Sequence, residues 1–266
     1  MKQCQPGNAV SLLENGEQDF PALEAAIDRA EREIFLQVYI FEDDETGRRI
    51  AAALERAAVR GVTVKVMVDG FGGRGFVMRL MPRLHGHGVQ VLIYRRDVRI
   101  LSLRRHRLRR LHRKVVVIDG REAFVGGINI IDDFTAGGPP HPRYDFAVHV
   151  RGPVLSPMVS SMNRLGRLVA WASFRRRQQL PLLAPAQAER VGNICAAYVV
   201  RDNLRFRHAI EDAYLAAIDG AQREIVIASA YFFPGRRFRQ ALIDAAARGV
   251  SITLLLQGIA DHPLQR

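Results

Sequence analysis

Residues 111–129 read LHRKVVVIDGREAFVGGIN, and this stretch decides how the rest of the chain is interpreted. Residues 115–118 are β-branched and apolar, which predicts a buried strand. Because side chains two residues apart in an extended chain share a face, we expect His112 and Lys114 to point the same way where this strand begins. An Asp-Gly pair that starts at Asp119 predicts a turn where the strand ends.

A second short strand is expected at residues 123–125, ending on Gly126 and Gly127. These glycines let the backbone approach a ligand closely, so Gly127 is a candidate substrate contact, and Asn129 adds an amide donor. An imidazole, an ammonium, a carboxylate and an amide are thus expected at one end of a strand pair. This set suits attack on a phosphodiester, with His112 as the nucleophile, cations on the phosphoryl oxygens and a carboxylate that fixes the ring.

The spacing His-x-Lys-x4-Asp, followed by Gly-Gly-x-Asn, resembles the HKD motif of the phospholipase D superfamily. The simpler alternative is a basic strand edge with a turn after it. The resemblance implies that His112 forms a phospho-histidine, that Lys114 and Asn129 hold the phosphoryl oxygens, and that Asp119 fixes the local geometry. In the superfamily an acidic residue downstream of the motif hydrogen-bonds the catalytic histidine, and Asp145 is the candidate here, although an Asp at a strand start is more often a solvated cap. No metal or organic cofactor is implied.

Before the motif, strands alternate with helices, which predicts an α/β fold with a mixed, mostly parallel sheet flanked by helices. Ligands in such sheets gather beyond the carboxyl ends of the strands, where the loops after Phe41 and Asp69 lie. The strands are expected at residues 9–13, 33–41, 62–68 and 89–94, and the helices at residues 20–30, 47–60 and 76–84.

The chain also repeats itself. Residues 26–34, AIDRAEREI, return as residues 217–225, AIDGAQREI, at an offset of 191, and residues 60–62, RGV, return as residues 248–250 at an offset of 188. A period this long indicates a duplicated domain and not a solenoid. We expect a phospholipase D-like domain at residues 8–172, a linker at 173–190 and a partial second copy at 191–266.

The repeat offset places the counterpart of His112 beyond Arg266, and no other His-x-Lys-x4-Asp occurs in the sequence. In the superfamily the second-half histidine protonates the leaving alkoxide, so His112 alone lacks an acid partner. Either the chain is truncated before its second motif, or a homodimer supplies two motifs. Truncation is favoured because a half-built sheet exposes an unpaired edge, and the activity of this chain is then expected to be weak.

Within the superfamily, three further stretches look like bacterial cardiolipin synthases of the type without transmembrane helices. They are residues 14–17 (ENGE), 39–47 (YIFEDDETG) and 68–72 (VDGFG), and one departure is Gln37, where Glu is expected. The resemblance implies that His112 attacks phosphatidylglycerol and that a second headgroup hydroxyl then displaces the histidine, giving cardiolipin and glycerol. It also implies a peripheral protein on the cytoplasmic side of the bacterial inner membrane.

The chain is basic, with 39 Lys and Arg against 27 Asp and Glu, a net charge of +12. Residues 95–114 carry ten Lys and Arg and one acid, which favours an anionic membrane surface or nucleic acid over a merely solvated loop. The segment lacks aromatic residues for base stacking, which disfavours nucleic acid and leaves a nuclease as the alternative. A binding remnant without activity is a second alternative. The expected membrane or anion contacts are Arg104, Arg105, Arg107, Arg109 and Arg110.

The two cysteines, Cys4 and Cys195, are expected to be reduced thiols, because one pair makes no disulfide framework. No His, Cys, Asp or Glu cluster has the spacing of metal ligands. The N-terminus lacks the apolar core of a signal peptide, and no apolar run reaches the length of about 18 residues that a membrane span needs. Any action on lipid is therefore expected from the surface.

Overall fold

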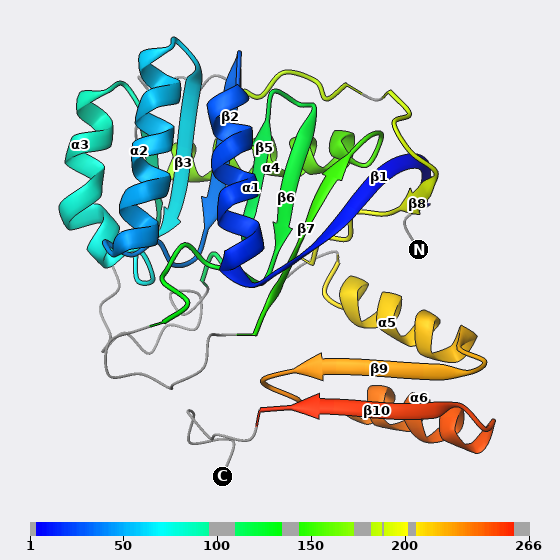
Figure 1. The fold of residues 1–266 in the computed structure, drawn as a ribbon. Helices are drawn as coiled ribbons and strands as arrows, with labels where there is room; N and C mark the ends of the chain where they lie inside the picture. Colours follow the sequence, from blue (N-terminus) through cyan, green and yellow to red (C-terminus); the bar gives the residue numbers. More distant parts are fainter. Residues whose placement is uncertain are drawn as a thin grey trace. The chain divides into compact units, whose positions relative to one another are not determined.

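The computed structural model describes residues 4–95, 110–134, 144–172, 182–187, 189–201 and 206–257. It divides the chain into two compact units, Cys4–Tyr198 and a second unit that begins at Val199 (Figure 1). The boundary falls later than the expected residue 191 because β8 (Ile194–Ala196) completes the sheet of the first unit.

An eight-stranded sheet forms the first unit, in the order β4-β3-β2-β5-β6-β7-β1-β8. Its other strands are β1 (Gln5–Glu14), β2 (Glu33–Val38), β3 (Thr63–Asp69), β4 (Gln90–Tyr94), β5 (Val115–Ile118), β6 (Glu122–Gly126) and β7 (Phe146–Arg151). Strands β2, β3 and β4 are parallel, whereas the other five neighbouring pairs are antiparallel. The expected mixed sheet is confirmed, but the expectation that it is mostly parallel is wrong. The turn between β5 and β6 is too short for a crossover, so these strands form a hairpin.

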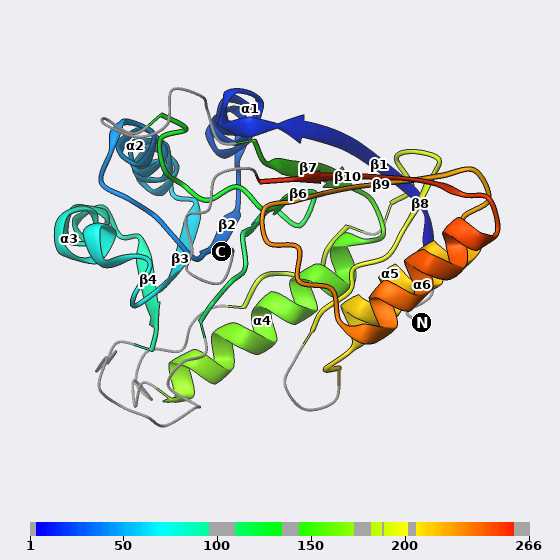
Figure 2. The ribbon, with the colours of Figure 1, turned by 90° about the horizontal axis from the view of Figure 1, so that it is seen from below.

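Helices cover both faces of this sheet, as the α/β prediction requires. On one face lie α1 (Asn15–Arg29), α2 (Glu45–Val59), the π-helical turn η1 (Phe76–Leu80) and α3 (Met81–Gly86), and on the other lies α4 (Leu155–Ala172) (Figure 2). Strand β2 shows the consequence: Ile34 and Leu36 join the first core, and Phe35 joins the second. All six residues of β2 are buried, as expected for a strand covered on both faces.

A disulfide joins Cys4 to Cys195, with 5.6 Å between their Cα atoms. The expectation of reduced thiols is therefore wrong. The two cysteines are 191 residues apart in sequence, and the antiparallel pairing of β1 with β8, in which Gln5 faces Ala196, brings them together. A crosslink over such a long loop restricts the unfolded chain and stabilises the folded one.

The second unit repeats the order of elements found in the first. It contains α5 (Ala209–Gly220), β9 (Glu224–Ser229), α6 (Arg236–Ala247) and β10 (Ser251–Leu256). Strands β9 and β10 are parallel with Glu224 facing Ser251, just as Glu33 of β2 faces Thr63 of β3. This common register supports the predicted internal duplication.

A guanidinium contact recurs at corresponding places in the two units. Arg60, which follows α2, donates to the carbonyl of Ile27 over 2.9 Å. Arg248, which follows α6, donates to the carbonyl of Ile218 over 3.0 Å. In both units the arginine at the end of the second helix therefore binds the end of the first one.

Candidate active site

His112 and Lys114 lie in the extended segment that leads into β5. The Nζ atom of Lys114 is 3.2 Å from Nε2 of His112, so the side chains point the same way, as their spacing predicts. The four residues of β5 are all buried, and their packing fixes the position of this segment at the end of the strand. When the imidazole is neutral, the ammonium can donate a hydrogen bond to its Nε2 lone pair.

Tyr39, immediately after β2, completes a compact group with this pair. Its ring centre lies 5.2 Å from that of His112, and the Nζ atom of Lys114 lies 5.6 Å from the centre of the same ring. An ammonium over an aromatic face is attracted by the ring quadrupole. The tyrosine therefore contacts both reactive side chains. Sequence reasoning noted it only as part of a family resemblance and did not include it in the site.

Asp69, the last residue of β3, was expected only to lie in a nearby loop, but the structure connects it to the catalytic segment. One carboxylate oxygen accepts a hydrogen bond of 2.8 Å from the backbone N–H of Leu111, the residue before His112. The other accepts from the N–H of Phe71 over 2.9 Å. Asp69 is 1% exposed, so these bonds are shielded from water. They fix the position of the backbone next to His112.

Burial and neighbouring charges tune the two reactive groups in different ways. Burial lowers the pKa of His112, the ammonium of Lys114 lowers it further, and Asp69 opposes both effects. Burial lowers the pKa of Lys114 to about 8, against the attraction of Asp145. Near pH 7 the imidazole is therefore mainly neutral, while the lysine is mainly charged. The Nε2 lone pair becomes available for attack when the ammonium turns from it to an anionic ligand.

Asn129, in the segment that follows β6, lies close to the end of β2. Its Oδ1 atom accepts a hydrogen bond of 3.1 Å from the N–H of Ile40, next to Tyr39. The backbone N–H of Ile130 donates to the carbonyl of Ile40 over 3.1 Å and strengthens this link. Because the oxygen is held by the backbone, the amide nitrogen is the part that can donate to an anionic ligand.

The Gly126-Gly127 pair has a packing role in addition to the substrate contact of Gly127, which stays a prediction. A Cβ atom on Gly127 would collide with the carboxylate of Asp145, and one on Gly126 would collide with the backbone of β7. The glycines thus admit a neighbouring strand of the same chain, and they let Asp145 lie close to the site.

Asp145 influences the lysine and does not bind the histidine. Its carboxylate accepts a hydrogen bond of 2.8 Å from the N–H of Phe146, and its charge favours the charged form of Lys114. No hydrogen bond joins Asp145 to His112 in the described part of the chain, so the one expected from the superfamily is not found. The nearest comparable role belongs to Asp69.

Asp119 lies at the opposite end of β5 from His112, so the prediction that its carboxylate meets the imidazole is wrong. A strand of four residues is about 13 Å long, which no side chain of this size can span. Asp119 is buried and accepts hydrogen bonds of 2.9, 2.8 and 2.9 Å from the N–H groups of Glu31, Arg32 and Glu33. It therefore stabilises the start of β2, whose other end carries Tyr39.

Of the expected anion contacts, only Arg110 belongs to the described residues. Its guanidinium lies 4.8 Å from the ring centre of Phe71, in the loop that Asp69 organises. The remaining arginines lie outside the described residues, namely Arg104, Arg105, Arg107 and Arg109.

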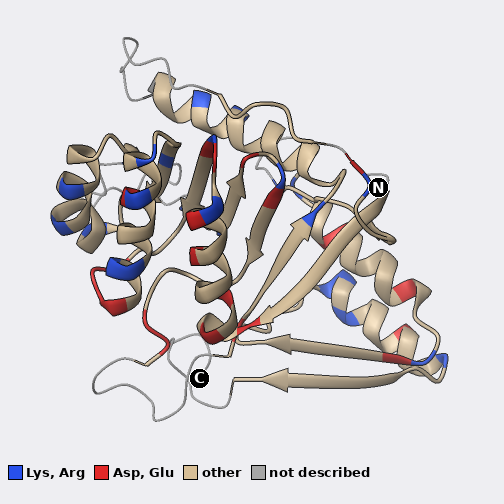
Figure 3. Cartoon of the chain, turned by 45° about the horizontal axis from the view of Figure 1, so that its top comes forward, with Lys and Arg blue, Asp and Glu red and all other residues tan. Residues whose placement is uncertain are grey.

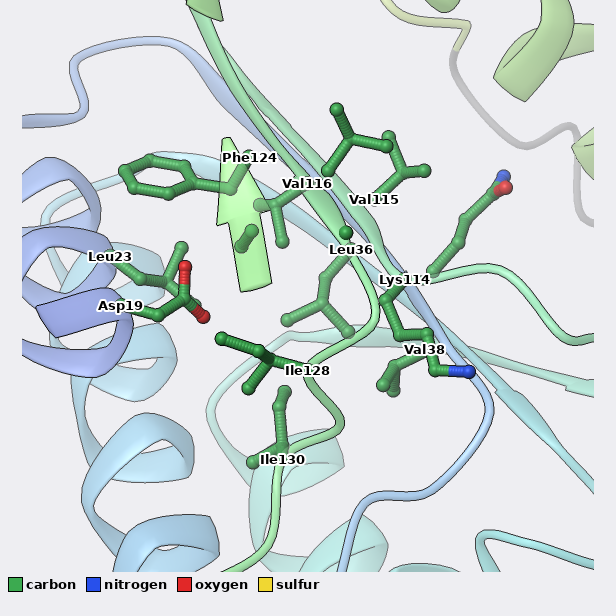
Figure 4. A pocket seen from close by; sticks show the side chains of 14 residues that line it. Asp19, Leu23, Leu36, Val38, Lys114, Val115, Val116, Phe124, Ile128 and Ile130 are labelled. Atoms are coloured by element: carbon green, nitrogen blue, oxygen red, sulfur yellow. The ribbon is translucent and has the colours of Figure 1, made fainter. Parts of the chain in front are cut away.

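A hollow of about 350 Å³, including its open mouth, adjoins Lys114 between α1 and the strands (Figure 4). Its walls are mainly apolar, and among the residues that form them are Leu23, Leu36, Val38, Phe124, Ile128 and Ile130. Asp19 points into it from α1, and burial, together with Asp133 and Asp145, raises its pKa to about 6. The Oδ1 atom of Asp19 has no hydrogen-bond partner among the described residues. The hollow is therefore mainly apolar and contains one carboxyl oxygen without a described partner.

Asp19→Asn is expected to stabilise the protein at pH 7. The pKa of Asp19 is raised on folding from 3.8 to about 6, so its contribution to stability is present below pH 4 and is lost as the pH rises through about 6. Removing the charge should therefore add about 1–3 kcal/mol to the free energy of unfolding at pH 7 and little at pH 4. Urea unfolding at both pH values measures this. Glu17→Gln, at an exposed position of the same helix, is the control. The assignment would be contradicted if Asp19→Asn gained no more stability over the wild type at pH 7 than at pH 4.

No group of three or more His, Cys, Asp or Glu residues in the described ranges is placed to hold a metal ion. Within the same ranges, no helix is both long and apolar enough to span a bilayer.

Comparison with protein families gives a match to the family described as "Cardiolipin synthase, PLD-like domain", over residues 23–135 and 214–266. The chain is 40% identical over 260 residues to cardiolipin synthase B of Salmonella typhi, covering 97% of this chain and 62% of that protein. It is 38% identical over 262 residues to cardiolipin synthase B of Escherichia coli K12, covering 98% of this chain and 62% of that protein. The chain therefore spans about 62% of the length of these relatives.

Solved structures show the same fold. The phosphatidylserine synthase of Haemophilus influenzae superimposes with a TM-score of 0.63 at 15% identity, covering 93% of this chain and 61% of that one. The polyphosphate kinase of Porphyromonas gingivalis superimposes with a TM-score of 0.53 at 17% identity, covering 96% and 39%.

Proposed function

Because this chain belongs to the cardiolipin synthase family of phospholipase D-like domains, we propose that it carries out phosphatidyl transfer through His112. The imidazole attacks the phosphorus of phosphatidylglycerol, a phosphorus–nitrogen bond forms, and the bond to the glycerol oxygen breaks, so that glycerol leaves once its oxygen takes up a proton. The headgroup hydroxyl of a second phosphatidylglycerol then attacks the same phosphorus, loses its proton and releases His112. The products are cardiolipin and glycerol.

The observation that carries this proposal is the contact between His112 and Lys114, 3.2 Å apart beside the ring of Tyr39. A neutral imidazole is a competent nucleophile, and an adjacent ammonium stabilises the charge that develops on the phosphoryl oxygens. The amide nitrogen of Asn129 supplies a second donor to the same oxygens. All these groups are side chains, so the proposed chemistry uses neither a metal nor an organic cofactor.

We propose from these substrates that the protein acts peripherally on an anionic surface of the bacterial inner membrane. The Arg-rich segment that starts at Arg95 supports this location, since each cation near an anionic bilayer contributes about 1 kcal/mol of binding energy. A second histidine, from a homodimer or from a longer form of the chain, would protonate the leaving glycerol.

Phosphatidylglycerol vesicles test the proposal directly. Incubation with the 266-residue chain is expected to yield cardiolipin and glycerol in equal amounts, measured by lipid mass spectrometry and by a glycerol assay. His112→Ala serves as the inactive control. Phosphatidic acid as the main product would point to hydrolysis in place of transfer. Cleavage of single-stranded DNA, with phosphatidylglycerol left intact, would contradict the proposal and favour the nuclease alternative.

A further inference from the structure

Helix α4 has two faces of opposite character. One packs on the sheet through residues Leu155, Met158, Val159, Met162 and Val169. The opposite face is an exposed stripe, defined by Arg164, Arg167, Leu168 and Trp171. Spacings of three and four residues put these four side chains on one line along the helix. The stripe is therefore a continuous surface.

The apolar members of this stripe are unusually exposed for their type. Leu168 is 57% exposed and Trp171 is 70% exposed. Tryptophan favours the boundary between water and lipid because its large apolar ring carries one polar N–H group. An exposed Trp beside an exposed Leu on a helix fits partial insertion into a lipid headgroup layer.

The polar members of the stripe are two arginines. Neither Arg164 nor Arg167 forms an ion pair with an acidic residue within the described ranges, whereas Arg48 and Arg56 on α2 do. Helix α4, along the top of Figure 3, contains no acidic residue. Between Asp145 and Glu189 the sequence holds six arginines and no acid. This surface is complementary in charge to anionic lipid and not to a neutral or cationic partner.

We propose that the stripe of α4 is a membrane-docking surface, with Trp171 and Leu168 in the headgroup layer and Arg164 and Arg167 on lipid phosphates. None of its four residues belongs to the group formed around His112. The choice of an anionic phospholipid bilayer as the occupant rests on the proposed function. The alternative occupant, a second copy of this chain, is an outcome of the test below.

Trp171 provides the measurement, because it is the only tryptophan of the chain. Its emission is expected to shift to shorter wavelength when the full chain is mixed with vesicles of phosphatidylcholine containing phosphatidylglycerol. Lipids brominated near the headgroup should quench it. Pure phosphatidylcholine vesicles should have little effect. His112→Ala should behave like the wild type, so a failure of phosphatidyl transfer would leave this result standing.

Matched variants distinguish the contribution of the stripe from a general effect of positive charge. Replacing both Arg164 and Arg167 by Gln is expected to weaken binding to anionic vesicles roughly 30-fold. The same change at Arg236 and Arg239, exposed arginines of α6, should have a small effect. Leu168→Ser keeps the tryptophan signal and should weaken binding several-fold. Met78→Ser, at a position that is 80% exposed on η1, is its control.

Three results would overturn the proposal. In the first, the chain co-sediments with anionic vesicles but Trp171 keeps its aqueous emission, so another surface binds the lipid. In the second, the chain binds no vesicles. In the third, the emission shifts with protein concentration in the absence of lipid, which would assign the stripe to contact between copies of this chain.

Discussion

Replacing His112 by alanine is expected to abolish a covalent phosphatidyl adduct on the protein and to slow phosphatidyl transfer by roughly 10⁴-fold or more, the usual cost of losing a nucleophile. Near neutral pH most of Lys114 is charged and cannot attack, whereas the lowered pKa of His112 leaves its imidazole mainly unprotonated and therefore nucleophilic. Acid-quenched peptide mass spectrometry should locate the phosphorus–nitrogen bond on His112 in the wild type.

The donor in this experiment should not depend on an acid partner. A nitrophenyl ester of phosphatidic acid suits it, because nitrophenolate leaves without a proton and its release can be followed by colour. Tyr94→Phe, a change at the end of β4 that removes only a hydroxyl group, is a control that should form the adduct normally. Release of nitrophenol by His112→Ala at the wild-type rate would exclude the histidine as the nucleophile.

Lys114 is expected to set the alkaline side of the pH profile. Its pKa of about 8 means that the ammonium loses its proton within the working range, so the rate should fall as the pH rises through about 8. The acid side should lie below pH 6.5, because burial and the ammonium hold the pKa of His112 under its ordinary value. Lys114→Met should reduce the rate about 10²–10³-fold and remove the alkaline limb.

Two consequences make this prediction specific. Without the ammonium, the pKa of His112 should rise, so the acid limb of the methionine variant should move to higher pH. Lys114→Arg keeps a charge at all working pH values, so its alkaline limb should disappear while part of the rate remains. A wild-type rate that stays constant between pH 7 and pH 10 would contradict the role of Lys114. The nitrophenyl donor reports both limbs.

Local patterns were sufficient to predict much of the fold. Four β-branched residues at 115–118 predicted β5, and helical spacing located α2 to within two residues, although α1 begins five residues before the predicted residue 20. The repeat predicted a second strand–helix–strand order after residue 217, which β9, α6 and β10 have, whereas the matching registers of β2 with β3 and of β9 with β10 came only from the structure. Parallel pairing was overestimated, since alternation of elements does not show which strands become neighbours across the sheet.

For the candidate site, spacing alone predicted that His112 and Lys114 lie together, because side chains two residues apart in an extended segment share a face. The same reasoning failed for Asp119, because the length of β5 separates it from His112. Asp145 was suggested by the superfamily resemblance and not by spacing, and its place beside Gly127 depends on how β7 packs against β6.

By itself the sequence determined the reactive pair, the family and the α/β class, because each depends on residues that are close in the chain or on a motif with fixed spacing. Only the tertiary structure decided that Tyr39 and Asp69 belong to the site, that Cys4 bonds to Cys195, and that Trp171 faces outward. The first two depend on contacts between residues that are distant in the chain, and sheet order decides which of those residues meet. The third depends on which face of α4 packs on the sheet.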